Sequence, residues 1–171
     1  MKTRRSPSSP VKIDRNYLKL ISHNPEQTQR IGAGIGELAL SGDIFLLVGG
    51  LGTGKTCLTQ GIAWGLGIKE YATSPSFVVV RELYGRLPLY HIDLYRLNHI
   101  EEIVELGLDD YLYGKGVCVV EWAEKALSAL PTEHLLIQIS YLSDTERSFQ
   151  LKPSGNRYLE IAAQLGKGVK S

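Results

Sequence analysis

The chain has 171 residues, 43% hydrophobic and 22% charged, and its 19 Lys and Arg against 18 Asp and Glu give a formal net charge of +1. This balance leaves no strongly basic surface for tight binding to nucleic acid or membranes, so we expect any nucleic acid to be reached through a protein partner. The length suits one hydrophobic core rather than two.

The first ten residues, MKTRRSPSSP, have the composition of a flexible basic tail, and we expect one domain over residues 11 to 171. Contact of this tail with an acidic partner is the less favoured alternative. No run of 18 apolar residues and no signal-peptide pattern is present, so neither a membrane span nor secretion is predicted. Cys57 and Cys118 match no metal-ligand spacing and are too few for a disulfide framework, which favours a reducing cytoplasm.

Residues 24 to 42 have the pattern of an amphipathic helix with apolar side chains at helical spacing. Asn24 is a candidate N-cap, Pro25 suits the first helical position, and Gly42 lies beyond the end. Several glycines weaken this prediction. The next segment, DIFLLV at residues 43 to 48, is a short continuous apolar run and predicts a strand covered on both faces.

A glycine-rich loop, GGLGTGKT, follows this strand and precedes a second helical pattern that starts at residue 55 and ends at Gly67. Its glycines let successive N–H groups turn toward one anion, and the helix N-terminus adds positive potential. Lys55 is expected to reach the outer phosphates, and the Thr56 hydroxyl to bind Mg²⁺. The predicted nucleotide-binding residues of the loop are Gly49, Leu51, Gly52, Thr53, Gly54, Lys55, Thr56 and Cys57.

After Pro75, residues 76 to 85 and 87 to 95 are two strand-like runs that predict an antiparallel hairpin. Residues 100 to 112 have a helical pattern, and residues 117 to 122, VCVVEW, predict another buried strand.

Near the end of the chain, residues 134 to 142 and 146 to 153 predict a second hairpin, and residues 156 to 166 a final helix. Parallel crossovers combined with hairpins indicate an α/β fold. With the phosphate loop, we expect a P-loop NTPase-like three-layer sandwich whose mixed sheet has a parallel core and antiparallel hairpins.

Two acidic residues end predicted strands: Asp93 follows LYHI, and Glu121 follows VCVV. A Mg²⁺ nucleotide site needs a second oxygen ligand or an acid that positions water, and the carboxyl ends of sheet strands open on the ligand crevice. We therefore expect both to reach one site. A structural pair of Asp93 with Arg96 or His91, and an ordinary strand-end role for Glu121, are the alternatives.

Five motifs in order resemble the bacterial TsaE (YjeE) family, small ATPases of the pathway that makes N6-threonylcarbamoyladenosine in tRNA. They are GGLGTGKT, SPSF at 74 to 77, LYHIDLYRL at 89 to 97, LGLDDYL at 106 to 112 and VCVVEW. The resemblance covers residues 24 to 125. It implies ATP/ADP and Mg²⁺ as cofactors, with Lys55 and Thr56 on phosphate and metal, Glu121 completing the metal site, and Asp93 needed for hydrolysis.

The resemblance implies further roles as well. Ser74 and Ser76 belong to a switch segment near the γ-phosphate, Thr28 lies toward the base, and Trp122 lies near the nucleotide. The implied partners are a threonylcarbamoyl transferase and its inactive paralogue, with tRNA contacted only indirectly. In such a complex ATP turnover supports repeated cycles of modification rather than the transfer itself.

The sequence departs from the family pattern at three positions. Gly50 stands where Asp is common, Cys57 where a second Thr often follows, and Ser76 where Thr is usual. Ser76 keeps the hydroxyl. Gly50 removes a charge and Cys57 removes a good hydrogen-bond donor, so nucleotide affinity and hydrolysis rate are expected to differ.

The predicted function is that of an ATPase, slow alone and dependent on protein partners. One alternative is a small-molecule P-loop kinase, which is less favoured because no arginine-rich lid segment is evident. The other is a nucleotide-gated binding module with negligible turnover, suggested by the lack of an obvious arginine finger.

Overall fold

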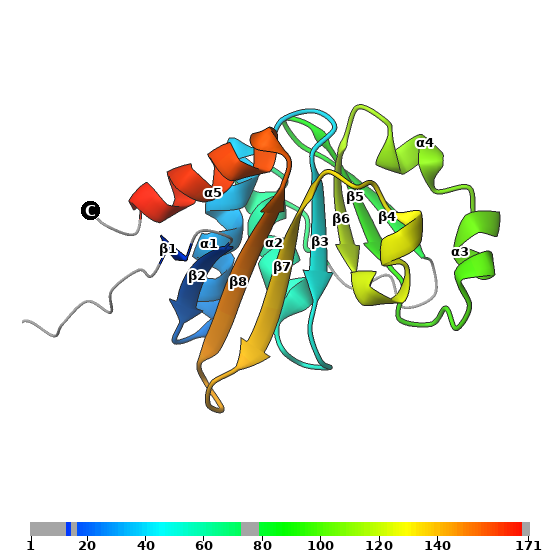
Figure 1. The fold of residues 1–171 in the computed structure, drawn as a ribbon. Coiled ribbons are helices and arrows are strands. Elements are labelled where there is room, and N and C mark those ends of the chain that lie inside the picture. The colour runs from blue at the N-terminus through cyan, green and yellow to red at the C-terminus, as the bar shows by residue number, and fades with distance from the viewer. Residues whose placement is uncertain (1–12, 15–16, 73–78, 169–171) are drawn as a thin grey trace, which may run out of the picture.

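The computed structural model describes residues 13–14, 17–72 and 79–168. In this part of the chain the strands form one eight-stranded sheet in the order β1-β2-β8-β7-β3-β6-β5-β4 (Figure 1). The strands are β1 (Ile13–Asp14), β2 (Tyr17–Ser22), β3 (Ile44–Val48), β4 (Val80–Tyr84), β5 (Pro88–Asp93), β6 (Val117–Glu121), β7 (His134–Tyr141) and β8 (Arg147–Ser154). The predicted tail at residues 1 to 10 lies outside the described residues.

The centre of the sheet is parallel and its sides are antiparallel. Strands β7, β3, β6 and β5 pair in parallel, whereas β4 pairs with β5, and β8 with both β7 and β2, in antiparallel register. This arrangement confirms the expected mixed sheet, with hairpins β4–β5 and β7–β8 on either side of the parallel core.

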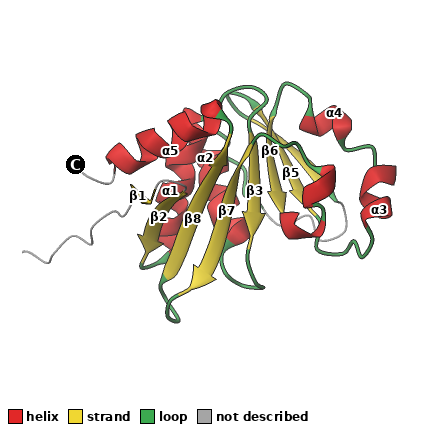
Figure 2. Cartoon of the chain, viewed as in Figure 1, coloured by secondary structure: helices red, strands yellow, loops and turns green. Residues whose placement is uncertain are grey.

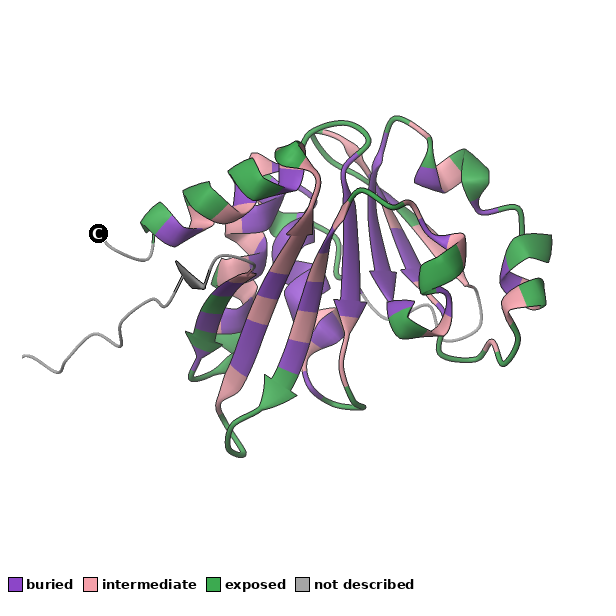
Figure 3. Ribbon diagram, viewed as in Figure 1, coloured by how far each residue is buried: buried purple, intermediate pink, exposed green. Residues whose placement is uncertain are grey.

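Helices cover both faces of the sheet (Figure 2). Phe45 and Leu47 of β3 join a buried cluster with helices α1, α2 and α5, and Ile44 and Leu46 join a second cluster with α3, α4 and residues in or next to two short 3₁₀ turns. Because successive side chains of a strand point to opposite faces, both faces of β3 are buried (Figure 3). The helical elements are α1 (Pro25–Leu38), α2 (Lys55–Gly65), α3 (Ile100–Glu105), α4 (Asp109–Leu112), η1 (Ala123–Lys125), η2 (Leu127–Ala129) and α5 (Asn156–Gly168).

The glycines of α1 and α2 allow these two helices to pack backbone against backbone. A Cβ atom at Gly36 would lie 2.2 Å from the Ile62 carbonyl oxygen, and one at Gly65 would lie 2.2 Å from the Ala33 carbonyl oxygen. No side chain larger than hydrogen fits there without moving the backbone. The glycines that weaken the helix prediction therefore hold α1 against α2, the helix that begins at the phosphate loop.

The start of α1 agrees with its prediction. Asn24 is the N-cap and accepts a 2.8 Å hydrogen bond from the Gln27 N–H through Oδ1, and Pro25 occupies the first turn.

Two elements differ from the sequence expectation. Residues 17–22 form β2, whose side chains alternate between buried and exposed, as expected of a strand with one face in water. The helical pattern at residues 100–112 is split into α3 and α4, because the chain turns at Gly107 with φ of 64°. In the described part of the chain no helix is long and apolar enough to cross a membrane.

Candidate functional site

The glycine-rich loop connects the end of β3 to the first residue of α2. Gly52 has φ of 74° and Gly54 has φ of 104°, conformations that favour glycine. Gly54 is the N-cap of α2 and has no side chain to offer to the N–H groups of the first helical turn. These donors and the positive end of the helix dipole form an arrangement suited to an anion.

Lys55 is the first residue of α2, and its ammonium group lies inside the loop. Its Nζ donates hydrogen bonds to the carbonyl oxygens of Gly49 at 2.7 Å and Gly50 at 2.8 Å. Burial lowers the pKa of Lys55 from its ordinary value, and the negative charges of Glu121, Glu124 and Asp93 act in the opposite direction. The result is a partly desolvated cation beside the uncapped amides.

Trp122 covers this lysine. The Lys55 Nζ lies 3.9 Å from the centre of a Trp122 ring, a cation–π contact. Trp122 is the one non-glycine residue of the described chain with positive φ, at 58°. Such a conformation costs about 1–3 kcal/mol and persists where the surroundings impose it. The Tyr95 ring packs against Trp122, and the centroids of the two rings are 4.9 Å apart.

Glu121, at the end of β6, is almost fully buried and has a polar partner on each carboxylate oxygen. Its Oε2 accepts from the Thr56 hydroxyl at 3.2 Å. Its Oε1 accepts from the Thr59 hydroxyl at 3.0 Å and is 2.8 Å from Nε2 of His91. Two oxygens, those of Thr56 and Glu121, thus adjoin each other at the start of α2, and oxygen is the donor type that Mg²⁺ prefers.

Asp93 ends β5 directly beside Glu121, its partner in the parallel register of β5 and β6. Its Oδ1 accepts a 2.9 Å hydrogen bond from the Tyr95 N–H, which fixes the orientation of the carboxylate. The proposed pair of Asp93 with His91 is wrong, because His91 bonds to Glu121 and its other ring nitrogen has no hydrogen-bond partner among the described residues.

Most of the predicted site residues line one cavity of about 310 Å³. It has walls from the loop, the first turn of α2 and the ends of β5 and β6. The residues lining it are Leu51, Gly52, Gly54, Lys55, Thr56, Cys57, Asp93, Tyr95, Glu121 and Trp122. The structure therefore brings the loop and both strand-end acids together, as the positions of the strand ends predict.

A second cavity, of about 370 Å³, adjoins the other side of the loop. Thr28 and Cys57 line it together with the backbone of residues 52–54 and the β7–β8 turn. The Thr28 hydroxyl lies 2.8 Å from that of Ser22. Burial, and then the charge of Glu26, raise the pKa of the Cys57 thiol, so the thiol form is favoured despite its place in the first helical turn.

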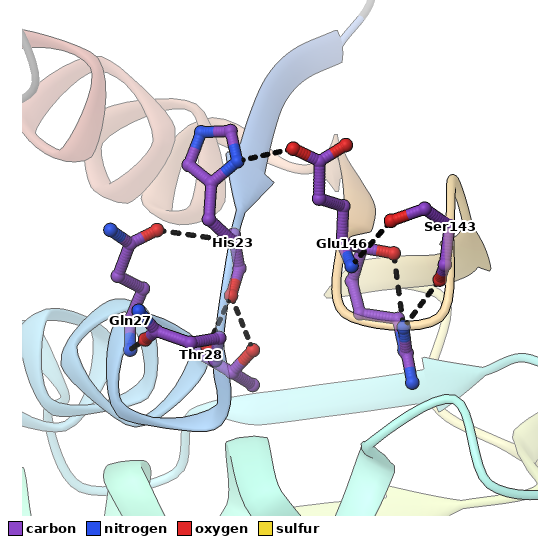
Figure 4. Close-up of polar contacts among 8 residues, drawn as sticks. His23, Gln27, Thr28, Ser143 and Glu146 are labelled. Atoms are coloured by element: carbon purple, nitrogen blue, oxygen red, sulfur yellow. Dashed lines mark hydrogen bonds and ion pairs between the residues drawn. The ribbon is translucent and has the colours of Figure 1, made fainter.

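Beside this second cavity a polar contact joins the segment before α1 to the β7–β8 turn (Figure 4). Nδ1 of His23, between β2 and α1, lies 2.7 Å from Oε1 of Glu146 in the β7–β8 turn. The His23 N–H donates to Oε1 of Gln27 at 2.7 Å, and the Glu146 N–H donates to the Ser143 hydroxyl at 3.1 Å. Residues 123 positions apart in the sequence thus meet at one end of the site.

Two residues of the second hairpin, which sequence reasoning missed, hold the backbone of the loop. The Tyr141 hydroxyl donates to the Leu51 carbonyl oxygen at 2.8 Å, and Nε of Arg147 donates to the Thr53 carbonyl oxygen at 3.2 Å. The guanidinium of Arg147 stacks 4.4 Å from the centre of the Tyr141 ring. A Cβ atom at Gly52 would lie 2.8 Å from the Tyr141 hydroxyl oxygen, so the loop packs closely on this residue.

Removing the Tyr141 hydroxyl is expected to weaken nucleotide binding without unfolding the protein. In Tyr141→Phe the loop loses one neutral hydrogen bond, which corresponds to about a threefold to tenfold loss of affinity. Titration calorimetry with ADP measures it, and Tyr113→Phe, at an exposed tyrosine beyond α4, is the matched control. An unchanged ADP affinity in Tyr141→Phe would show that the hairpin does not hold the loop in its binding conformation.

The predicted switch residues Ser74 and Ser76 lie outside the described residues. In the described part of the chain, no group of three or more His, Cys, Asp or Glu side chains is placed to hold a metal ion. Cys57 and Cys118 are both free thiols.

The chain matches a family model and several known proteins. The model of the Threonylcarbamoyl adenosine biosynthesis protein TsaE matches residues 22–149. A tRNA threonylcarbamoyladenosine biosynthesis protein TsaE of Bacillus subtilis (strain 168) is 43% identical over 151 residues, 88% of this chain and 94% of the relative. The protein of that name from Treponema pallidum (strain Nichols) is 41% identical over 130 residues, 76% of this chain and 96% of the relative.

A solved structure agrees with these matches. The crystal structure of Bacillus subtilis YdiB has a TM-score of 0.78 and 40% sequence identity to this chain, covering 94% of this chain and 99% of that one. The residues matched by the family model include the loop, both strand-end acids and the turn between β7 and β8.

Proposed function

The chain belongs to the TsaE family of tRNA threonylcarbamoyladenosine biosynthesis proteins, and from this premise we propose that it binds and hydrolyses ATP with Mg²⁺ at the loop of residues 49–54. The observation that carries the proposal is the meeting of Lys55, Thr56 and Glu121 beside Asp93 in one cavity. A loop that only turned the chain would have no need of a buried cation facing two strand-end acids.

The side chains present suit a magnesium nucleotide. Thr56 and Glu121 would hold Mg²⁺, since their oxygens adjoin at 3.2 Å and Glu121 carries the negative charge. Mg²⁺, when bound, supplies a positive charge that offsets the charge of the phosphates. Lys55 and the first-turn amides of α2 bind phosphate oxygens, and Trp122 shields Lys55 from water.

Asp93 is the proposed catalytic residue. Its carboxylate is oriented by the Tyr95 N–H and lines the cavity that Lys55 enters. A carboxylate so placed can accept a hydrogen bond from a water molecule and orient it toward the terminal phosphate. Glu121 has both oxygens engaged by Thr56, Thr59 and His91 and is assigned to the metal instead.

The charges around the cavity support the proposed dependence on a partner. Among the described residues that line it, Lys55 is the one cation. Phosphoryl transfer commonly needs a further positive group at the transition state, supplied by the same chain or by a partner. We therefore propose slow turnover by the protein alone and faster turnover in a complex with the threonylcarbamoyl transferase and its inactive paralogue, with tRNA contacted through them.

The presence of Lys55 as the one cation among the described lining residues also suits a second function. If no partner supplies the missing charge, the site would bind ATP and act as a nucleotide-gated binding module without turnover. Phosphate release by the complete mixture of protein, partner pair, tRNA and Mg·ATP separates these functions, and a phosphorylated small-molecule product would indicate a kinase.

Glu121→Gln is expected to reduce the magnesium-dependent part of nucleotide affinity. The amide keeps the shape of the side chain but lacks the charge that holds the metal, so affinity in Mg²⁺ should fall by about tenfold or more, while affinity in EDTA should change little. Fluorescence titration with a labelled ATP analogue measures both. Glu101→Gln, at an exposed position of α3, is the control. Equal losses with and without Mg²⁺ would remove Glu121 from the metal site.

A further inference from the structure

His91 is a fully buried histidine in the middle of a sheet strand, with 0% of its surface exposed. It lies opposite Val119 in the parallel register of β5 and β6, two residues before Asp93. Residues two apart on a strand share a face, so His91 points to the same side of the sheet as Asp93 and Glu121. From there its Nε2 comes within 2.8 Å of Oε1 of Glu121.

The hydrogen-bonding partners define what His91 does for Glu121. An ionised carboxylate only accepts hydrogen bonds, so Nε2 of His91 carries the hydrogen and donates. Nδ1 of His91 is buried and has no hydrogen-bond partner among the described residues. A hydrogen on Nδ1 would be left without an acceptor and away from water, so the geometry places the ring hydrogen on Nε2.

The two oxygens of Glu121 have different surroundings. Oε1 accepts from His91 and from the Thr59 hydroxyl, and Oε2 faces the Thr56 hydroxyl. The Thr59 hydroxyl has one hydrogen and also lies 2.9 Å from the Lys55 carbonyl oxygen, so its donation to Glu121 is shared. His91 is therefore the donor committed to Oε1.

We propose that His91 is a positioning residue for the magnesium site: its Nε2–H fixes Oε1 of Glu121 and so presents Oε2, beside the Thr56 hydroxyl, as the ligating oxygen. The inference rests on the proposed function of the loop. Side chains that hydrogen-bond to a metal ligand and orient it raise metal affinity, and their loss lowers that affinity by about 10-fold to 100-fold. Because its ring contacts Oε1 and not the ligating Oε2, His91 acts on the metal only through Glu121.

The test compares two substitutions of His91 with a matched control. His91→Leu removes the donor at similar volume, and His91→Gln keeps an N–H that can reach Oε1. His134→Leu makes the same change at the start of β7, where Nδ1 of the ring lies 2.7 Å from the Pro131 carbonyl oxygen. For each protein, the affinity for a fluorescent ATP analogue is measured with Mg²⁺ and with EDTA, and Mn²⁺ binding to the ADP complex is followed by electron paramagnetic resonance.

The expected result is specific to the metal. His91→Leu should lose about 10-fold to 100-fold in Mn²⁺ affinity and the same factor in the gain that Mg²⁺ gives to nucleotide affinity. Its affinity in EDTA should stay near that of the wild type, and His91→Gln should recover most of the loss. Equal losses with Mg²⁺ and with EDTA, or no loss at all, would overturn the proposal. A wild-type protein that gains nothing from Mg²⁺ would instead contradict the proposed function itself.

A second measurement uses the unaltered protein and decides the question if His91→Leu does not fold. The nitrogen-15 resonances of the His91 ring are recorded in the ADP complex with EDTA and then with Mg²⁺. Metal binding to Oε2 changes the electron density at Oε1, so the Nε2–H resonance should shift while the rings of His99 and His134 stay constant. A His91 resonance that does not respond to Mg²⁺ would overturn the proposal.

Discussion

Lys55→Ala should lower the affinity for ATP and ADP by about 100-fold or more, because hydrogen bonds to a charged group contribute up to about 3 kcal/mol each. The effect is expected to be large because the ammonium is partly desolvated and lies inside the loop, against the carbonyl oxygens of Gly49 and Gly50. Titration calorimetry with each nucleotide measures the change.

The control for this substitution is Lys115→Ala. Lys115 is an exposed lysine just before β6, at the opposite end of that strand from Glu121. The Lys115→Ala protein should bind nucleotide with the affinity of the wild type. Circular dichroism checks that both variants are folded. A Lys55→Ala protein that is folded and keeps its ATP affinity would remove the phosphate loop from the proposed function.

Asp93→Asn should leave ATP binding near normal and lower turnover by about 100-fold or more, the range over which a positioned acid or base contributes. The asparagine Oδ1 can still accept from the Tyr95 N–H, so the local turn is preserved. What is lost is the negative charge that orients water. Phosphate release in the presence of the partner pair measures turnover, because the protein alone is expected to be slow.

The control here is Asp110→Asn, at an exposed position of α4. It carries the same change of charge outside the residues that line the cavity. If Asp93→Asn released phosphate at the wild-type rate, Asp93 would return to the alternative of a structural role. If it lost nucleotide affinity as well, its carboxylate would act in binding rather than in the reaction.

The loop and the strands around it could be predicted from the sequence because their signals are local. The apolar run of β3, the glycines after it and the helical pattern of α2 adjoin one another in the chain. They predict a strand, a phosphate-binding loop and a helix in that order. The meeting of Asp93 and Glu121 could be predicted without knowing the strand order, since the carboxyl ends of parallel strands share one edge.

The contacts that sequence reasoning missed depend on register and on distant loops. His91 and Glu121 pair because β5 and β6 are neighbours in one particular register, which short apolar runs do not specify. Tyr141 and Arg147 reach the loop across 90 or more positions, and in the sequence they are ordinary hairpin residues.

Secondary-structure differences have local causes. The strand β2 has only Leu18, Leu20 and Ser22 as buried side chains, too short a pattern to stand out from the sequence around it. The break between α3 and α4 depends on the conformation of Gly107, whereas the glycines of α1 lie within a continuous helix. Glycine alone does not distinguish a turn from a close helix contact.

The most direct test of the central claim is phosphate release from Mg·ATP by the wild-type protein, alone and with the threonylcarbamoyl transferase, its paralogue and tRNA. ATP affinity is measured in the same samples. We predict slow release by the protein alone, a marked rise in the complete mixture, and no phosphorylated small molecule among the products. Tight ATP binding with release at background in every mixture would contradict the account and identify the site as a nucleotide-gated switch.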